Sequence, residues 1–293
     1  MRILITGAAG MLAHDLIETL AEEKHELILN DIRPLPSSSG KGFKFIEFDI
    51  TDKDRVYNET TKINPDMVIH TAACTDVDGC EKDADLAFKV NSLGTRNIAL
   101  ACQRFDTVML YVSTDYVFDG KGKEPYNEYK TPNPENIYAR SKYWGELYVE
   151  RLLNKFYIVR SAWLYGKYGE NFASKILSLA KKQKEISVVN DQIGSPTYTK
   201  DLAKAIKHLI GTGLYGTWHI TNGGQCSWYE FAKEILKQQS IKNVTVKPID
   251  SVRLSRPAKR PAFSVLDNYL WHLHGFSPLR NWKDALIEFM GEI

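Results

Sequence analysis

Three residues near the middle of the chain have side chains suited to acid–base chemistry on a carbonyl group. Tyr138 and Lys142 are four residues apart in a segment with helical spacing, so they lie on one face of a predicted helix. A lysine beside a tyrosine lowers the pKa of the phenol and lets it give a proton to a ketone oxygen. Thr114 closes a predicted strand, and its hydroxyl could hold that oxygen. Such a Tyr–Lys pair is common by chance, so the prediction depends on its surroundings.

A glycine-containing loop near the N-terminus predicts a dinucleotide site. The segment GAAGMLA (7–13) stands between a strand-like run at 2–6 and a helical pattern at 11–23. Gly7 permits a tight turn, and Gly10 lets a pyrophosphate approach the backbone. The helix N-terminus then offers N–H groups and the positive end of its dipole. A plain tight turn is the alternative, but the position after the first strand favours the phosphate site.

Residues at other predicted strand ends extend this site. Asp31 ends the second strand, and its carboxylate could accept hydrogen bonds from the adenosine ribose hydroxyls. Arg33 could instead pair with a 2′-phosphate, so the sequence leaves NAD(H) and NADP(H) open as cofactors. Lys142 could also bind the nicotinamide ribose. The further cofactor contacts predicted at strand ends are Asp49, Ile50, Ala72, Ala73, Cys74, Thr75 and Ser113.

Strand and helix signals alternate through the first half of the chain. Apolar runs predict strands at 2–6, 26–31, 43–48, 67–69, 107–112 and 156–160. Longer periodic segments predict helices at 11–23, 84–102 and 137–153. This alternation predicts an α/β fold, a Rossmann-type doubly wound parallel sheet with right-handed crossovers. We expect a dinucleotide-binding domain over 1–165 and a smaller mixed α/β substrate-binding lobe over 166–293, with the chain crossing between them.

Composition excludes several classes of protein. The formal net charge is +2, which disfavours nucleic acid as a main partner. No apolar run approaches the length that crosses a bilayer, and the N-terminus opens on a strand-like run without a signal peptide pattern, so we expect a cytoplasmic protein with no membrane partner. The spacing of the four cysteines is not that of a metal site or a disulfide framework, so we interpret them as buried or idle thiols.

Seven motifs occur in order along almost the whole chain. They are GAAGMLA (7–13), HTAACTDVDGCE (70–81), STDYVFDG (113–120), YARSK (138–142), RSAWLYG (160–166), NDQIGSPTYT (190–199) and RPAKRPAFSVLDN (256–268). Together they resemble the dTDP-4-dehydrorhamnose reductase family of extended short-chain dehydrogenases. The resemblance implies NAD(P)H-dependent reduction of the 4-keto group of a nucleotide-activated deoxysugar. The expected reaction converts dTDP-4-dehydro-L-rhamnose to dTDP-L-rhamnose, for cell-surface polysaccharide synthesis.

The same resemblance assigns roles to matching positions. It makes Tyr138 the proton donor with Lys142 as its partner, and Thr114 the third catalytic residue. Met11 and Leu12 join Gly10 in the pyrophosphate loop. The residues that match substrate-facing positions are Thr114, Asp115 and Trp163 for the sugar, with Asn171 and Arg260 for the nucleotide end. Arg260 also lies in a basic, proline-stiffened segment that suits a diphosphate. The chain departs from the family at Cys74, where Tyr or His is frequent, and at Ala139, where Gly is frequent.

Other interpretations stay open at this point. A sugar-nucleotide dehydratase or epimerase is one, although Tyr116 follows Asp115 where dehydratases carry a second acid. A non-catalytic regulatory subunit, like that of methionine adenosyltransferase, is another. Asp15 and Asp191 could be remnants of a divalent-cation site near a subunit contact, but Asn190 is a poor ligand, so we expect no metal. We expect a nucleotide-sugar substrate as the partner and a monomer or a homodimer.

Overall fold

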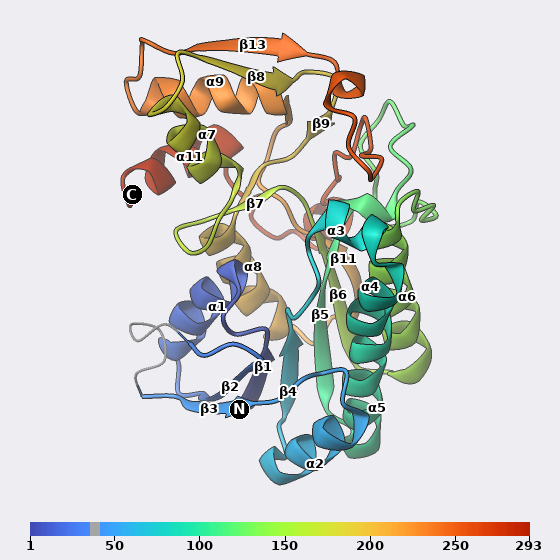
Figure 1. Ribbon diagram of the computed structural model, residues 1–293. Helices are drawn as coiled ribbons and strands as arrows, with labels where there is room; N and C mark the ends of the chain where they lie inside the picture. Colours follow the sequence, from blue (N-terminus) through green and yellow to red (C-terminus); the bar gives the residue numbers. More distant parts are fainter. Residues whose placement is uncertain (36–41) are drawn as a thin grey trace.

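A seven-stranded parallel sheet forms the centre of the molecule (Figure 1). The computed structural model describes residues 1–35 and 42–293. The strands in spatial order are β11 (Gly216–His219), β6 (Phe156–Ser161), β5 (Val108–Thr114), β4 (Met67–His70), β1 (Arg2–Thr6), β2 (Glu26–Asp31) and β3 (Lys44–Glu47). Strand order reverses between β1 and β4, the position where open α/β sheets bind ligands. The predicted Rossmann-type sheet is confirmed.

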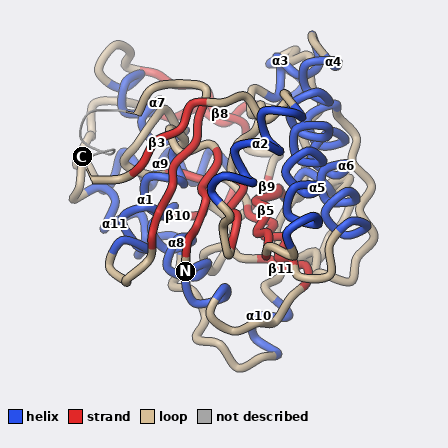
Figure 2. The backbone as a smooth tube through the Cα atoms, turned by 90° about the horizontal axis from the view of Figure 1, so that it is seen from below, coloured by secondary structure: helices blue, strands red, loops and turns tan. Residues whose placement is uncertain are grey.

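Helices cover both faces of this sheet, which explains why its inner strands are apolar along their length (Figure 2). On one face, α1 (Met11–Ala21) and α8 (Thr199–Ile210) pack on a core that includes Leu16 and Ile206. On the other face, α2 (Lys53–Ile63), α5 (Thr95–Phe105) and α6 (Ile137–Leu152) enclose a second core. The result is a three-layer domain with ligand-binding loops at the carboxyl ends of the strands.

The chain crosses between lobes after residue 165. β11 pairs in parallel with β6, and α8 packs against α1, so both return to the sheet domain from the second half of the chain. A short helix, α10 (Tyr269–Leu273), contacts β11 as well. A single boundary at residue 165 therefore does not separate the two lobes along the sequence.

The smaller lobe has its own apolar core. It is built from α7 (Phe172–Ala180), α9 (Trp228–Gln238) and α11 (Trp282–Met290), packed on the parallel pair β8 (Glu185–Val189) and β13 (Thr245–Ile249). α9 begins at a capping box formed by Ser227 and Glu230. The remaining short elements are β7 (Leu164–Tyr165), β9 (Ile193–Gly194), β10 (Thr197–Tyr198), β12 (Cys226–Ser227) and the 3-10 turns Asp115–Val117 and Ser251–Leu254.

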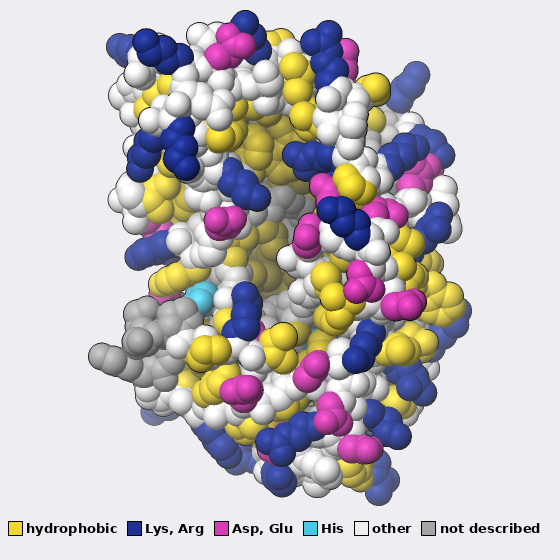
Figure 3. Space-filling model, viewed as in Figure 1, with side chains coloured by type: hydrophobic (Ala, Val, Ile, Leu, Met, Phe, Trp, Pro, Cys, Tyr) yellow, Lys and Arg dark blue, Asp and Glu magenta, His cyan; other side chains and the backbone are white. Residues whose placement is uncertain are grey.

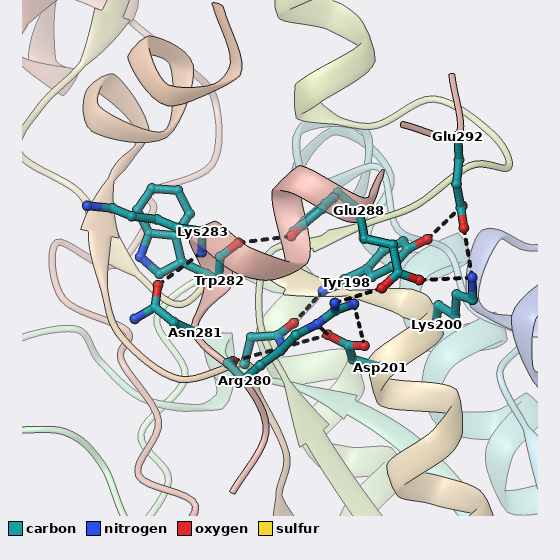
Figure 4. Close-up of polar contacts among 11 residues, drawn as sticks. Tyr198, Lys200, Asp201, Arg280, Asn281, Trp282, Lys283, Glu288 and Glu292 are labelled. Carbon is teal, nitrogen blue, oxygen red and sulfur yellow. Dashed lines mark hydrogen bonds and ion pairs between the residues drawn. The ribbon is translucent and has the colours of Figure 1, made fainter. Parts of the chain in front are cut away.

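An ion-pair network ties this lobe to the sheet domain (Figure 4). Arg280 binds Asp201 of α8 through two nitrogens, at 2.7 and 2.8 Å, and also reaches Glu288 of α11 at 2.7 Å. Lys200 of α8 pairs with Glu288 and Glu292. Because α8 belongs to the sheet domain, these contacts fix the C-terminal helix against it.

The helix predicted over 84–102 is interrupted in the structure. It consists of α4 (Ala84–Phe88), a π-helical stretch (Lys89–Gly94) and α5. A preceding helix, α3 (Val77–Lys82), was not predicted, because its six residues are too few to show a hydrophobic period. π-helical stretches frequently occur at functional sites. Within the described residues, no helix combines the length and apolar character required to cross a membrane.

Candidate active site

The glycine-containing loop packs closely against the loop that follows β4. Gly7 has a φ of +76°, and a Cβ at this position would lie 2.5 Å from the Ala72 backbone nitrogen. Only glycine fits there without strain or clash. Gly10 is the N-cap of α1, which begins with no side-chain cap and no acidic residue in its first turn. Its free N–H groups therefore suit an anion such as a pyrophosphate.

The Asp31 carboxylate stabilises this loop directly. One oxygen accepts a hydrogen bond from the Ala9 backbone N–H at 2.9 Å, and the other accepts one from the Arg33 N–H at 2.9 Å. The Arg33 guanidinium lies beside the same carboxylate and is 66% exposed. The Asp31 carboxylate is thus buried and accepts two backbone hydrogen bonds, whereas the Arg33 guanidinium has donors without a partner in the part of the chain that the structure describes.

The loop after β3 is held by α5. Ile50 is buried and in contact with Gly94, and its carbonyl oxygen accepts a hydrogen bond from Asn97 at 3.0 Å. The Asp49 carboxylate accepts the Thr51 backbone N–H at 2.8 Å and is otherwise exposed. These two predicted adenine-side residues therefore lie on a loop with fixed geometry.

Asn91 joins the cofactor loop after β4 to the catalytic helix. Its side chain accepts from the Cys74 N–H at 2.8 Å and donates to the Cys74 carbonyl at 3.0 Å. It also donates to the Ser141 hydroxyl at 2.9 Å, and Ser141 in turn donates to the carbonyl of Tyr138. The sequence analysis missed Asn91. Asn91 lies in a π-helical turn, and the spacing of apolar residues in the sequence does not reveal such a turn.

The three predicted catalytic residues meet at the carboxyl end of β5. The phenol of Tyr138 lies beside the Thr114 hydroxyl, which acts to lower the pKa of the tyrosine. Burial outweighs that effect, so without a bound cofactor the pKa of Tyr138 is above its usual value. The tyrosine is therefore a neutral phenol, the form that donates a proton.

Lys142 lies one helical turn after Tyr138 on α6. Its ammonium group donates to the carbonyl oxygen of Val112 at 2.7 Å and lies 4.1 Å from the centre of the Tyr111 ring. Burial lowers the pKa of Lys142 to about 7, and the negative charge of Glu146 opposes this shift. A lysine with a pKa in this range can gain and lose a proton near neutral pH.

A buried ion pair lies one helical turn further along α6. Glu146 accepts from two nitrogens of Arg160, at 2.9 and 2.6 Å, and from the Ser113 hydroxyl at 2.5 Å. Both charged side chains are almost completely buried. Ser113, a predicted cofactor contact, thus uses its hydroxyl proton within the protein. Its role toward a cofactor stays a prediction.

Asp115 has an unpaired oxygen in the same region. Its Oδ1 atom accepts from the Thr114 hydroxyl at 3.1 Å, whereas its buried Oδ2 atom has no hydrogen-bond partner in residues 1–35 and 42–293. Burial raises the pKa of this carboxyl to about 7. A buried polar atom without a partner is costly, and a sugar hydroxyl would supply one.

Trp163 has a strained backbone and a stacked ring. Its φ is +48°, a region that residues with side chains rarely occupy. The indole stacks on Trp228 of the smaller lobe, with 3.5 Å between ring centroids, and lies against Gly194, where a Cβ would clash with it. Figure 3 shows the surface hollowed between the two lobes, with hydrophobic side chains in the hollow.

The two residues predicted at the nucleotide end have polar contacts within the protein. The Asn171 side chain caps α7 by accepting from the Ser174 N–H, and its amide donates to the Gly166 carbonyl at 2.8 Å. Arg260 makes a two-pronged ion pair with Asp78 of α3 and also donates to the Ala258 carbonyl. Contacts of either residue with a nucleotide stay predictions.

No group of three or more potential metal-ligating side chains is present in residues 1–35 and 42–293. Asp191 accepts hydrogen bonds from the backbone and hydroxyl of Ser251, and Asn190 accepts from Ser227. Asp15 of α1 lies beside Thr199, the first residue of α8, and burial raises its pKa to about 6; its buried Oδ2 atom has no hydrogen-bond partner among the described residues. Asp191 and Asn190 thus have hydrogen-bond partners within the protein, and the absence of a metal stays a prediction.

Comparisons with known proteins agree on one family. The family model described as "RmlD substrate binding domain" matches residues 1–293. A dTDP-4-dehydrorhamnose reductase of Streptomyces griseus is 39% identical over 98% of this chain and 92% of its own. The solved structure of such a reductase from Clostridium acetobutylicum has a TM-score of 0.93, 41% identity and coverage of 100% and 99% of the two chains. A Bacillus anthracis structure in complex with NADP has a TM-score of 0.91, 43% identity and 99% coverage of each chain.

Proposed function

The chain belongs to the dTDP-4-dehydrorhamnose reductase family, and we propose that it reduces the 4-keto group of dTDP-4-dehydro-L-rhamnose, with NADPH as the hydride donor. The product is dTDP-L-rhamnose, a precursor for cell-surface polysaccharide. The observation that carries this proposal is the convergence of Thr114, Tyr138 and Lys142 at the carboxyl end of β5, beside an uncapped helix N-terminus that suits a dinucleotide.

Thr114, Tyr138 and Lys142 would each have a separate role in the reduction. A bound dinucleotide supplies hydride to C4 of the sugar. Thr114 donates a hydrogen bond to the ketone oxygen, and Tyr138 gives that oxygen its proton, so the ketone becomes an alcohol. Lys142, one helical turn from Tyr138 on α6, supplies a positive charge that favours the phenolate that remains. Reprotonation of the phenolate restores the starting state.

The preference for NADPH or NADH depends on Asp31 and Arg33, at the end of β2. The Asp31 carboxylate already accepts hydrogen bonds from the Ala9 and Arg33 backbone, while the exposed Arg33 guanidinium keeps free donors. A 2′-phosphate carries the charge that a guanidinium binds through two hydrogen bonds. This arrangement favours NADPH over NADH.

We expect the sugar ring to bind between the two lobes. The unpaired Oδ2 of Asp115 is next to the Thr114 hydroxyl, and the Trp163 ring belongs to the neighbouring aromatic stack. The Arg260–Asp78 pair fixes the segment that leads to Ser264, whose hydroxyl acts on the Asp115 carboxyl. A sugar ring between Asp115 and Trp163 would leave its dTDP group extending toward the smaller lobe.

The alternatives from the sequence are less well supported. A 4,6-dehydratase needs a second acid beside Asp115, and the half-buried Tyr116 ring occupies that position, in edge contact with Tyr138 at 5.9 Å. A regulatory subunit has no need of a proton donor and lysine with this geometry.

The test is a spectrophotometric assay of purified protein with dTDP-4-dehydro-L-rhamnose, following NADPH oxidation and identifying the sugar product. Parallel reactions use NADH, a UDP-linked 4-keto sugar, and no sugar. We expect turnover with the dTDP sugar and NADPH. NADPH oxidation that is no faster with the sugar than without it would rule out the proposal.

A further inference from the structure

Two cysteine thiols meet near α6, the helix that carries Tyr138. The Sγ atoms of Cys74, in the loop after β4, and Cys80, in α3, are 3.6 Å apart, and both residues are reduced in this structure. The sequence analysis interpreted all four cysteines as buried or idle thiols, because they show no close paired spacing. α3 packs against α6, so the thiol pair lies on an element that contacts the predicted catalytic helix.

The helix that carries Cys80 connects three parts of the site. Asp78 holds Arg260 of the C-terminal segment, and Glu81 accepts the Ile137 backbone N–H at 2.9 Å, at the start of α6. Cys74 is fixed from the other side by its two hydrogen bonds to Asn91. A change at this thiol pair would therefore shift the loop after β4, the start of α6 and the segment that carries Arg260.

We propose that Cys74 and Cys80 form a reversible disulfide, a modification site that weakens NADPH binding and turnover when oxidised. The oxidant is a low-molecular-weight disulfide of the glutathione class. Disulfides in proteins of reducing compartments are mostly transient, catalytic or redox-sensing. The formation of this bond does not depend on which sugar the enzyme reduces.

The steps balance as thiol–disulfide exchange. The partly exposed Cys74 thiolate attacks one sulfur of the oxidant, forming a mixed disulfide and releasing one small thiol. Cys80 then attacks the Cys74 sulfur, a new S–S bond forms, and the second small thiol leaves. The two cysteines together lose two protons and two electrons. The oxidant takes up both protons and both electrons when it becomes two small thiols. Burial raises the pKa of Cys80 to about 12, so Cys74 reacts first.

Closing this bond brings the two sulfurs nearer to each other. A disulfide requires about 2.05 Å between the sulfurs, compared with 3.6 Å here. Asn91 holds the Cys74 backbone on both its N–H and its carbonyl, so any backbone shift that accompanies the bond would strain these hydrogen bonds or α3 with Asp78 and Glu81. The bond also ties the loop after β4, a predicted cofactor contact, covalently to α3.

The experiment follows the thiols directly. Reduced protein is equilibrated in buffers of glutathione and glutathione disulfide, and free thiols are then alkylated. The tryptic peptide 63–82 contains both cysteines and no others. We expect a species of this peptide that lacks both alkyl groups, is lighter by two hydrogen atoms, and disappears with dithiothreitol. In parallel, we expect NADPH affinity by fluorescence titration and turnover each to fall tenfold or more.

Matched variants separate this site from general oxidation damage. Cys80→Ala removes the second thiol without touching the loop after β4. We expect the reduced variant to keep NADPH binding, and the oxidised variant to stop at a glutathione adduct on Cys74 without forming an internal disulfide. Cys102→Ala removes another buried thiol, on α5, and should respond as the wild type does. A Cys80→Ser variant repeats the test if the alanine variant does not fold.

Two results would overturn the proposal. One is a 63–82 peptide that carries both alkyl groups, or only a glutathione adduct, at every redox ratio tested. The other is wild-type protein that carries the Cys74–Cys80 disulfide by peptide mass and yet binds NADPH as tightly as the reduced protein does. Because NADPH affinity and peptide mass are read without the sugar, a failure here is distinguishable from a failure of the proposed reaction.

Discussion

Glu146 binds Arg160 through both of its carboxylate oxygens, at 2.6 and 2.9 Å, in a fully buried position one helical turn from Lys142. The same carboxylate accepts the Ser113 hydroxyl, so it joins α6, β5 and β6. Buried ion pairs contribute little net stability compared with apolar packing, but breaking one leaves a charge uncompensated. The pair therefore positions the strand end that carries Thr114 relative to the helix that carries Tyr138.

Replacing the phenol tests the proton donor. Tyr138→Phe keeps the ring but removes the acid, and we expect kcat to fall by ~10²–10⁴, the usual worth of general acid catalysis. NADPH affinity, measured by fluorescence titration, should stay within about twofold because the loop at Gly7 to Ala13 is unchanged. Phe substitution at Tyr143, one residue past Lys142, is the control and should leave kcat unchanged. Near wild-type turnover of Tyr138→Phe would remove the tyrosine from the mechanism.

Glu146 should control the pH dependence of the reaction. Its negative charge raises the pKa of Lys142 against the effect of burial. If the protonated lysine is the active form, the rate falls as pH rises through that pKa, and Glu146→Gln moves this falling limb to lower pH. The substitution also leaves the Arg160 charge unpaired, so we expect a loss of about 3–5 kcal/mol in stability. An unchanged pH profile in folded Glu146→Gln would show that Glu146 has only a structural role.

Most of the first half of the fold was predictable, because its strands and its longer helices each have a periodic signal, which the six residues of α3 are too few to show. The predicted strand at 2–6 and the predicted helix at 137–153 match β1 and α6 to within a residue. The return of β11 and α8 to the sheet could not be predicted, because sequence spacing does not say which lobe a strand joins. Asn91 and Cys80 were also missed. Their importance comes from contacts between segments that have no shared sequence pattern.

Arg33 should distinguish the two nicotinamide cofactors. Its guanidinium is exposed beside Asp31 and has donors free for a 2′-phosphate. We expect Arg33→Ala to raise KM for NADPH roughly tenfold. A charge-assisted hydrogen bond contributes on the order of 1.5–3 kcal/mol to binding before solvent screening reduces it. KM for NADH, which lacks the phosphate, should change little. Equal increases for both cofactors would mean that Arg33 acts on the loop rather than on the phosphate.

Arg260 has two possible roles, and a double-mutant cycle with Asp78 separates them. The ion pair holds the pKa of the Asp78 carboxyl below its usual range, so the stability it contributes is present at neutral pH and lost as pH falls through the lowered pKa.

The variants separate the two roles through KM for the sugar nucleotide. If Arg260 only holds the segment that leads to Ser264 in place, then Arg260→Ala, Asp78→Ala and the double variant should raise this KM by the same factor. If Arg260 also binds the diphosphate, Arg260→Ala should raise that KM several-fold more than Asp78→Ala does. In both cases KM for NADPH should stay near the wild-type value, because neither Arg260 nor Asp78 is among the predicted cofactor contacts. Wild-type KM values in all three variants would show that neither residue acts on the substrate, and the diphosphate would have to be held by other residues of the smaller lobe.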